Sequence, residues 1–156
     1  METLNVLSAG AAQVVVERVA EEFRRHHASR CATIFGGVHA MRLRLLEGEP
    51  ADVVVLTDEL IDDLIARRLV VAGSRVDLGT VATGVAVRTG TRMPDVSDTL
   101  ALRETLLAAR AIIAPDPQFA TAGRVLLAAL QSLGIEERVG PQLVWTESGH
   151  AALKRL

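Results

Sequence analysis

The sequence predicts an α/β fold of two lobes, and three features of the chain support that prediction. The first is the alternation of apolar, strand-like segments with amphipathic helical segments from residue 4 to residue 68, which is typical of a parallel sheet flanked by helices. The second is a group of glycines between residues 73 and 90, which interrupts the alternation. The third is a later repeat of the opening arrangement, in which a short apolar strand leads into small residues at a helix start. We therefore expect lobe 1 over residues 1–80, and a crossover strand with a partial lobe 2 over residues 81–156.

The first lobe is expected to open with a strand that runs directly into a helix. Leu4–Leu7 is apolar, and apolar residues then recur at helical spacing from Ala12 to Phe23. Ser8 stands where a helix N-cap belongs, and the small residues after it allow a ligand to approach the free first-turn amides. A capped helix after a buried strand explains the same residues, so this turn alone does not establish an anion site.

Two further strand–helix pairs are expected to complete the first lobe. Cys31–Phe35 is a strand candidate, and two glycines separate it from a helix over Val38–Glu47. The run from Asp52 to Leu56 is apolar after its first residue, which is typical of a strand covered on both faces of a parallel sheet. Thr57 is expected to cap the next helix.

The second lobe is expected to follow an extended segment at Val81–Val87 that crosses between the lobes. Ser97 is the expected N-cap of its first helix, and Gly134 is the expected end of a later helix. The remaining elements expected in this half are strands at Ala111–Ala114 and Leu143–Trp145, a stiff loop over residues 115–123, and a last helix over Glu147–Leu156.

The composition excludes several classes of function. Hydrophobic residues make up 49% of the 156 residues, so the chain can form a packed core, but aromatic residues make up only 3%, which argues against stacking on nucleic-acid bases. The net charge of -2 provides no basic excess for a phosphate backbone or an anionic membrane. No apolar run approaches the roughly 20 residues of a membrane span. We expect no nucleic-acid partner and no membrane insertion, and a cytoplasmic location for the chain as written, or a periplasmic one if a leader has been removed.

The sequence contains no strong metal or catalytic motif. Cys31 is the only cysteine, so it cannot form an internal disulfide, and it is expected to be buried and inert. Lys154 is the only lysine, which excludes a P-loop. Ser148 is expected to be a helix N-cap rather than a nucleophile. We therefore expect neither a metal nor a cofactor.

Three stretches of the chain together resemble the periplasmic molybdate-binding protein family. They are the Ser-Ala-Gly turn after Leu7, the Gly-x-Pro-Ala-Asp-Val element at residues 48–53, and the loop from Asp-Pro to Thr-Ala-Gly at residues 116–123. The resemblance implies a periplasmic-binding-protein-like fold that holds a small anion at helix N-termini in the cleft between two lobes, with an ABC transporter as the partner. It implies that the ligand-binding residues are Ser8, Ala9, Gly10, Gly37, Val38, His39, Thr121, Ala122 and Gly123.

The chain departs from the family pattern at the second of these turns. The family usually has serine or threonine near positions 38 and 39, where Val38 and His39 stand here, so a hydroxyl donor is lost. His39 can donate to a carboxylate, which favours a small organic acid over molybdate. A histidine exposed in a helix first turn is the alternative interpretation of the same residue.

Family members also continue beyond the helix expected at the end of this chain. The second lobe and the return crossing are therefore expected to be incomplete. The surface that the return would cover is expected to be an apolar patch, which usually marks a partner surface. We expect a homodimer or a domain-swapped pair.

Two functions of different class follow from the resemblance. The first is a substrate-binding protein for a small anion. The second is an isomerase of a small unsaturated carboxylic acid such as aconitate, because some relatives of the family catalyse that reaction. Such a proton shift needs an acid or base beside the bound carboxylates, and His39 is the one catalytic candidate near the expected cleft. A shortened relative that binds no ligand is a third hypothesis.

Overall fold

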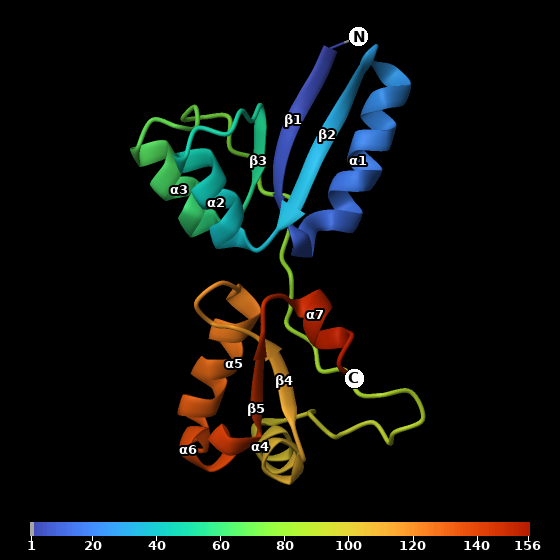
Figure 1. Ribbon diagram of the computed structural model, residues 1–156, viewed down its shortest axis with the longest axis vertical. Coiled ribbons are helices and arrows are strands. Elements are labelled where there is room, and N and C mark those ends of the chain that lie inside the picture. The colour runs from blue at the N-terminus through green and yellow to red at the C-terminus, as the bar shows by residue number, and fades with distance from the viewer. Residues whose placement is uncertain (1) are drawn as a thin grey trace. The chain divides into compact units, whose positions relative to one another are not determined.

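The computed structural model describes residues 2–156 and divides into two compact units, residues 1–81 and residues 82–156 (Figure 1). We call these unit 1 and unit 2. Unit 1 contains β1 (Glu2–Ala9), the short 3₁₀ helix η1 (Gly10–Ala12), α1 (Gln13–His26), β2 (Ser29–Gly36), α2 (Val38–Leu46), β3 (Val53–Val55) and α3 (Asp58–Ala66). Unit 2 contains α4 (Thr99–Ala108), β4 (Ile112–Pro115), α5 (Thr121–Ser132), α6 (Glu136–Val139), the 3₁₀ helix η2 (Gly140–Gln142), β5 (Leu143–Thr146) and α7 (Gly149–Leu153).

The sheet of unit 1 has three parallel strands in the order β2-β1-β3. The central strand β1 pairs with β2 along eight residues and with β3 along three. The crossover from β1 to β2 and the crossover from β2 to β3 run in opposite directions across the sheet, so right-handed connections place α1 and α2 on opposite faces. This arrangement confirms the predicted alternation of strands and helices in a parallel α/β sheet.

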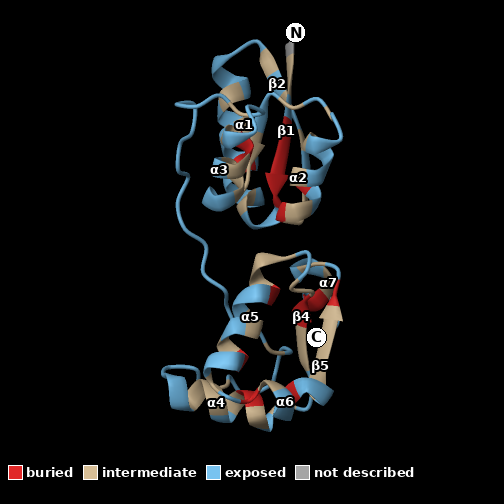
Figure 2. Ribbon diagram, turned by 90° about the vertical axis from the view of Figure 1, so that its left-hand side faces the viewer, coloured by how far each residue is buried: buried red, intermediate tan, exposed pale blue. Residues whose placement is uncertain are grey.

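The core of unit 1 is centred on β1, where buried residues concentrate in Figure 2. Val6 and Leu7 are adjacent in the strand and therefore face opposite sides of the sheet, and both are buried. Val16 of α1, Met41 of α2 and Leu64 of α3 are buried from the helical layers. Helices therefore pack on both faces of the three-stranded sheet.

Two expectations about apolar segments in unit 1 are wrong in part. Val53 of β3 is 45% exposed, because β3 is an edge strand with only β1 beside it. In α1, Val16 is buried, whereas Val15 and Val19 are 48% and 60% exposed. The helix packs mainly along β2, which is also an edge strand, so the narrow sheet covers only part of the predicted apolar stripe.

Unit 2 is built on a smaller sheet, in which β4 and β5 pair in parallel. Its core is a cluster of four buried residues, Leu106, Leu130, Ile135 and Val139, contributed mainly by helices. The predicted strands and the helix that ends before Gly134 are confirmed, and Gly134 has the positive φ of 64° that ends a helix. The short α6 was not predicted, and α7 is shorter than the helix expected there.

The extended segment expected at Val81–Val87 forms no paired strand within residues 2–156. Val81 is 70% exposed and Val85 is 48% exposed, and only Val87 at its end is half-buried. A strand requires a neighbour to satisfy its backbone groups, and the described residues provide none here.

Two helix caps differ from the sequence expectation. The N-cap of α4 is Asp98, whose Oδ1 accepts from the amide of Ala101 at 2.8 Å, while Ser97 donates to Asp95 at 2.7 Å. The cap prediction was therefore wrong by one residue, because the carboxylate of Asp98 occupies the capping position. Thr57 is the N-cap residue of α3 as expected, but its side chain makes no capping bond.

Candidate functional site

The two turns of unit 1 that were predicted to bind a ligand, one after β1 and one after β2, lie next to each other at the carboxyl ends of these strands. Ala9 and Gly36 are the last residues of β1 and β2, and they are paired in the sheet register. A Cβ atom on Gly10 would lie 3.6 Å from the carbonyl oxygen of Gly36, which places the two turns in contact. Ligands of parallel α/β sheets bind beyond the carboxyl ends of the strands, and both turns are at those ends.

Ser8 does not cap a helix. It lies inside β1 and is fully buried, and its Oγ donates to the carbonyl oxygen of Ala9 at 3.2 Å. The N-cap residues are Ala9 for η1 and Ala12 for α1, and neither helix has a side-chain cap. The prediction was wrong because β1 continues through Ala9, so the chain turns one residue later than the position of Ser8 suggested.

The second turn of unit 1 presents backbone rather than side chains. Gly37 is the N-cap of α2 and has no side chain with which to cap it. Val38 is 8% exposed and belongs to the core, so only its backbone remains for a ligand. His39 is half-buried in the first turn of α2. Where the family usually has serine or threonine, this turn therefore carries the buried side chain of Val38 and the imidazole of His39.

In unit 2, the loop before α5 is stiff, as the sequence indicated. The carbonyl oxygen of Asp116 accepts from the amides of Phe119 and Ala120 at 3.1 and 2.9 Å, and its Oδ1 accepts from the amide of Gln118 at 2.7 Å. The amide of Asp116 in turn donates to Thr146 of β5 at 2.8 Å. These bonds fix the loop on the end of the β4–β5 sheet.

Gly123 is required by packing at the start of α5. A Cβ atom on this residue would lie 2.1 Å from the carbonyl oxygen of Pro115 and 2.7 Å from the nitrogen of Pro117. Backbone atoms cannot yield as a flexible side chain can, so only glycine fits. Sequence reasoning assigned Gly123 to the ligand, and the geometry assigns it first to the contact between α5 and the preceding loop.

Thr121 is the first residue of α5, and its hydroxyl is buried without a hydrogen-bond partner. Its Oγ1 is shielded from solvent and has no hydrogen-bond partner, a state shared within residues 2–156 only by Oε1 of Gln142. Buried polar atoms are normally paired, and an unpaired one calls for an explanation such as a missing water or ligand. This signal depends on tertiary packing and was not visible in the sequence.

The α-helices of the structure begin in different ways. Side chains cap α4 and α7, through Asp98 and Ser148. Acidic residues occupy the first turns of α3 and α6, where they complement the positive end of the helix dipole. The starts of α1, α2 and α5 have neither a side-chain cap nor an acidic first turn, and these are the three helices that follow the predicted site residues.

An ion-pair network holds α2 against α3 beside the second turn. Asp63 of α3 accepts from Arg42 of α2 at 2.5 Å and from Arg67 at 2.9 Å. Hydrogen bonds from Arg42 first, and then from Arg67, hold the pKa of the Asp63 carboxyl below its ordinary value. Because Arg42 lies one turn after His39, this network fixes the helix that presents the histidine.

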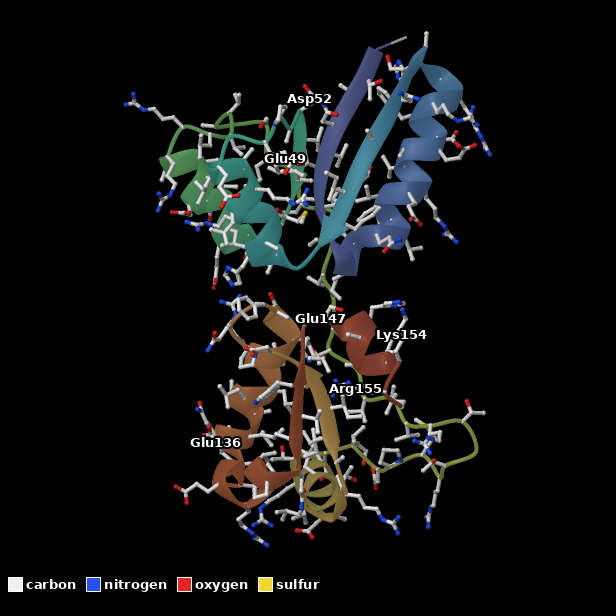
Figure 3. All side chains as sticks on the ribbon, in the orientation of Figure 1. Glu49, Asp52, Glu136, Glu147, Lys154 and Arg155 are labelled. Atoms are coloured by element: carbon white, nitrogen blue, oxygen red, sulfur yellow. The ribbon has the colours of Figure 1, made fainter. Side chains whose placement is uncertain are left out.

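The Asp52 of the Gly-x-Pro-Ala-Asp-Val element has a structural role at the start of β3 (Figure 3). Its Oδ2 accepts from the amide of Asn5 at 2.7 Å, and its own amide donates to the carbonyl oxygen of Asn5 at 2.8 Å. This reciprocal pair sets the register of β3 on β1. The Gly-x-Pro-Ala-Asp-Val element was therefore informative about the fold, and the carboxylate of Asp52 is engaged in a hydrogen bond within the sheet.

Residues 2–156 contain no group of three or more histidine, cysteine, aspartate or glutamate side chains placed to hold a metal ion. Over the same residues, no helix combines the length and apolarity needed to cross a bilayer.

The solved structures that resemble this one include two proteins named for molybdenum or molybdate. The substrate binding domain of a putative molybdenum ABC transporter from Clostridium difficile superposes with a TM-score of 0.60 and 14% identity, covering 99% of this chain and 66% of that chain. The periplasmic molybdate-binding protein of Azotobacter vinelandii superposes with a TM-score of 0.69 and 16% identity, covering 97% of this chain and 65% of that chain. At these identities the likeness establishes the fold, which is that of two-lobed periplasmic binding proteins.

Sequence comparison gives a relative and a family. An aconitate isomerase from Pseudomonas sp is 34% identical over 119 residues, which cover 73% of this chain and 45% of that protein. The chain thus spans less than half the length of this relative. The family model of the bacterial extracellular solute-binding proteins matches residues 4–156. Because the match covers nearly the whole sequence, the chain belongs to the bacterial extracellular solute-binding protein family.

Proposed function

We propose that this chain binds a small anion, either an oxyanion or a small carboxylate, as a substrate-binding component of an ABC transport system. The candidate contacts of unit 1 by itself are the backbone groups of Ser8–Gly10 and Gly37–His39, and those of unit 2 by itself are the backbone groups of Thr121–Gly123. Membership of the solute-binding family supports the class of function. The two similar solved structures, which are named for molybdenum and molybdate, support an anion as the ligand.

The observation that carries the proposal is the state of the helix starts. Of the α-helices in residues 2–156, α1, α2 and α5 alone begin with neither a side-chain cap nor an acidic first turn. The first-turn amides of α2 and α5, and those of η1, which runs directly into α1, are therefore not neutralised by capping or acidic side chains. The amide of Gln13 at the start of α1 itself donates to the carbonyl oxygen of Gly10. A carboxylate or oxyanion complements this combination of free N–H groups and positive potential.

Magnitudes indicate that the anion contacts the amides directly. A helix dipole stabilises a nearby charge by about 0.3–1 kcal/mol, and micromolar binding requires about 8 kcal/mol. Helix dipoles alone therefore fall short. Hydrogen bonds to a charged group contribute about 1.5–3 kcal/mol each, so several amide contacts are needed. Small residues such as Ala9, Gly10 and Ala122 permit that close approach.

Thermal unfolding against molybdate, tungstate, sulfate, phosphate, citrate and trans-aconitate tests the proposal. A ligand at about 100 times its dissociation constant adds about 2.7 kcal/mol to the free energy of unfolding, which is a shift of several degrees. The matched variants are Thr121→Pro and Thr99→Pro. Each replaces the first residue of a helix in unit 2, where proline is tolerated, after an extended residue.

Thr121→Pro removes an amide and a hydroxyl from the proposed site, so we expect binding to weaken at least tenfold. Thr99→Pro makes the same backbone change at α4, where we expect no loss of affinity. Equal losses in both variants, or no stabilisation of the unmodified protein by any anion of the panel, would contradict the proposal.

A second candidate is isomerisation of a small unsaturated carboxylate. It is supported by the 34% identity with the aconitate isomerase and by the presence of His39 in the first turn of α2. In that reaction one group removes a proton from the carbon beside the double bond, the double bond shifts to include that carbon, and a proton is delivered to the far carbon of the original double bond. His39→Gln is expected to abolish turnover of aconitate while retaining binding of the substrate. Turnover that survives this change would remove His39 from the mechanism.

We also propose that two copies of the chain associate through Val81–Val87. This segment is rich in strand-forming valine, contains no charge, and has no strand partner within residues 2–156. Exposed segments of this composition tend to pair with another chain. Sedimentation velocity is expected to give the mass of a dimer, and replacing Val85 by lysine is expected to shift it toward the monomer. A monomer at all protein concentrations would contradict the association.

A further inference from the structure

Residues 71–87, which we call the arm, are the longest run of exposed residues in the part of the chain that the structure describes. Every residue of the arm except the last is exposed. Five of its large apolar side chains are between 48% and 78% exposed, namely Val71, Val76, Leu78, Val81 and Val85. Apolar surface gathered on one segment in this way usually marks a site of association.

The arm is anchored near both ends and is unpaired between the anchors. Near its start, Nη1 of Arg75 donates to Oδ1 of Asp62 in α3 at 2.6 Å. Just after its end, Nε of Arg88 donates to the carbonyl oxygen of Leu156. Residues 78–87 make no hydrogen bond with any other described residue. Their backbone donors and acceptors are therefore available to pair with another strand.

The sheet of unit 1 has a free edge at β3 that suits such a strand. On one side β3 pairs with β1, and on the other side it pairs with no strand among residues 2–156. Its sequence, Val53-Val54-Val55, has no polar residue, which is typical of a strand inside a parallel sheet rather than at its edge. Val53 is nevertheless 45% exposed. A neighbouring strand would cover the apolar surface that this edge leaves in water.

The other edge strand of the same sheet, β2, is a poorer acceptor. It is already paired with β1 along all eight of its residues, and it carries the exposed, charged Arg30. Charged side chains on edge strands are a common protection against the addition of further strands. β3 has no charged residue, so the free edge of β3 is the better match for the uncharged segment Val81–Val87.

We propose that two copies of the chain exchange arms, and that Val81–Val87 of each copy adds as a fourth strand to the free edge of β3 in the other. This inference rests on the proposed association through Val81–Val87 and names the surface that receives the segment. Two arms paired only with each other would form a two-stranded ribbon, which is marginally stable in water. Addition to β3 instead extends a sheet that already has helices on both faces, and it removes apolar surface of both strands from water.

Sedimentation velocity of the full chain over a range of concentrations tests the acceptor with two matched variants. Val53→Lys places a charge on β3, and we expect it to raise the dissociation constant of the dimer by about tenfold or more, because the ammonium group would lose water on strand addition. Ile34→Lys is the control, since Ile34 is also β-branched, is 38% exposed and lies on β2. We expect this variant to dimerise as the unmodified protein does.

The outcomes separate the inference from the association on which it rests. If Val85→Lys dissociates the dimer and Val53→Lys does not, the association stands and docking on β3 is overturned. Equal dissociation by Val53→Lys and Ile34→Lys also overturns it. An unmodified protein that is a monomer at all concentrations contradicts both proposals. Urea denaturation of the three variants checks that unit 1 remains folded.

Disulfide cross-linking tests the same contact without adding a charge. In a Cys31→Ser background, chains with Val53→Cys are mixed with chains that carry either Thr83→Cys or Val85→Cys, so that more than one register is sampled. Mild oxidation is expected to join the two kinds of chain into a covalent dimer that contains one of each. A bond within single chains of the double variant, with no covalent dimer in the mixtures, would contradict the exchange. A covalent dimer of the arm variant alone, without the mixed species, would show that arms pair with each other and would overturn docking on β3.

Discussion

Helices α4 and α5 both lie in unit 2 and both begin with a threonine after an extended residue, but their first turns are stabilised differently. Asp98 caps α4 by accepting from the amide of Ala101. At the equivalent position of α5 stands Ala120, which has no side chain able to cap. Replacing an N-cap aspartate by alanine typically costs about 1 kcal/mol. The open start of α5 therefore lacks stabilisation that α4 has, and a ligand that accepts from its amides would supply it.

The largest expected effect tests whether the start of α5 is rigidly held. Gly123→Ala would place a Cβ atom 2.1 Å from the carbonyl oxygen of Pro115, so we expect a loss of about 3 kcal/mol in the free energy of unfolding. Gly149→Ala is the control, because nothing lies within 4 Å of its Cβ position and Gly149 is the first residue of α7, where a helical backbone suits alanine. Urea denaturation that gives equal midpoints for the two variants would show that α5 does not need its close contact with the loop.

A smaller effect tests the other side of the comparison. Asp98→Ala removes the cap of α4, so we expect a loss of about 1 kcal/mol in the free energy of unfolding and no change in anion affinity. Asp98→Asn retains a capping oxygen and is expected to lose less than half as much. If Asp98→Ala also weakens anion binding, the distinction between a structural and a ligand-binding helix start fails.

The smallest effect concerns unit 1 and its dependence on pH. Hydrogen bonds from Arg42 and Arg67 lower the pKa of Asp63, so the folded state favours its ionised form. The resulting stabilisation is present above the unfolded pKa, near 3.9, and is lost as the pH falls through the lower folded value. Urea denaturation of the protein and of Asp63→Asn should differ at pH 6 and converge as the pH falls below about 4. A difference independent of pH would assign the role of Asp63 to packing.

Most of the fold could be predicted from the sequence, because the apolar residues recur at the spacings of strands and helices, although α1 and β3 are less buried than that pattern indicates. The Asp52 element was also informative, although its carboxylate turned out to bridge β3 to Asn5 in the sheet. Errors arose where neighbouring residues offered equivalent chemistry. Ser97 and Asp98 can both cap a helix, and only the backbone geometry of the turn selects Asp98.

The candidate site was harder to predict from the sequence than the fold, because tertiary packing decides which groups there are available. Ser8 has the chemistry of a cap, but strand pairing of β1 extends through Ala9 and buries it. The sequence identified Gly123 as a small residue at a helix start. The reason that glycine is required there is a close backbone contact with Pro115, which depends on tertiary packing. The unpartnered hydroxyl of Thr121 likewise exists only in the folded chain. Local patterns locate helix starts, and packing decides which groups there remain available.

The most direct test of the account is to give α5 the cap that α4 has. Ala120→Asp places a carboxylate at the N-cap, where the backbone is extended as it is at Asp98. We expect the free energy of unfolding without ligand to rise by about 1 kcal/mol, and anion binding measured by titration to be lost, because the side chain occupies the amides and repels the ligand. Ala120→Asn, which caps without charge, is expected to bind more weakly than the unmodified protein. Undiminished anion affinity in Ala120→Asp would contradict the claim that the open start of α5 is a binding site.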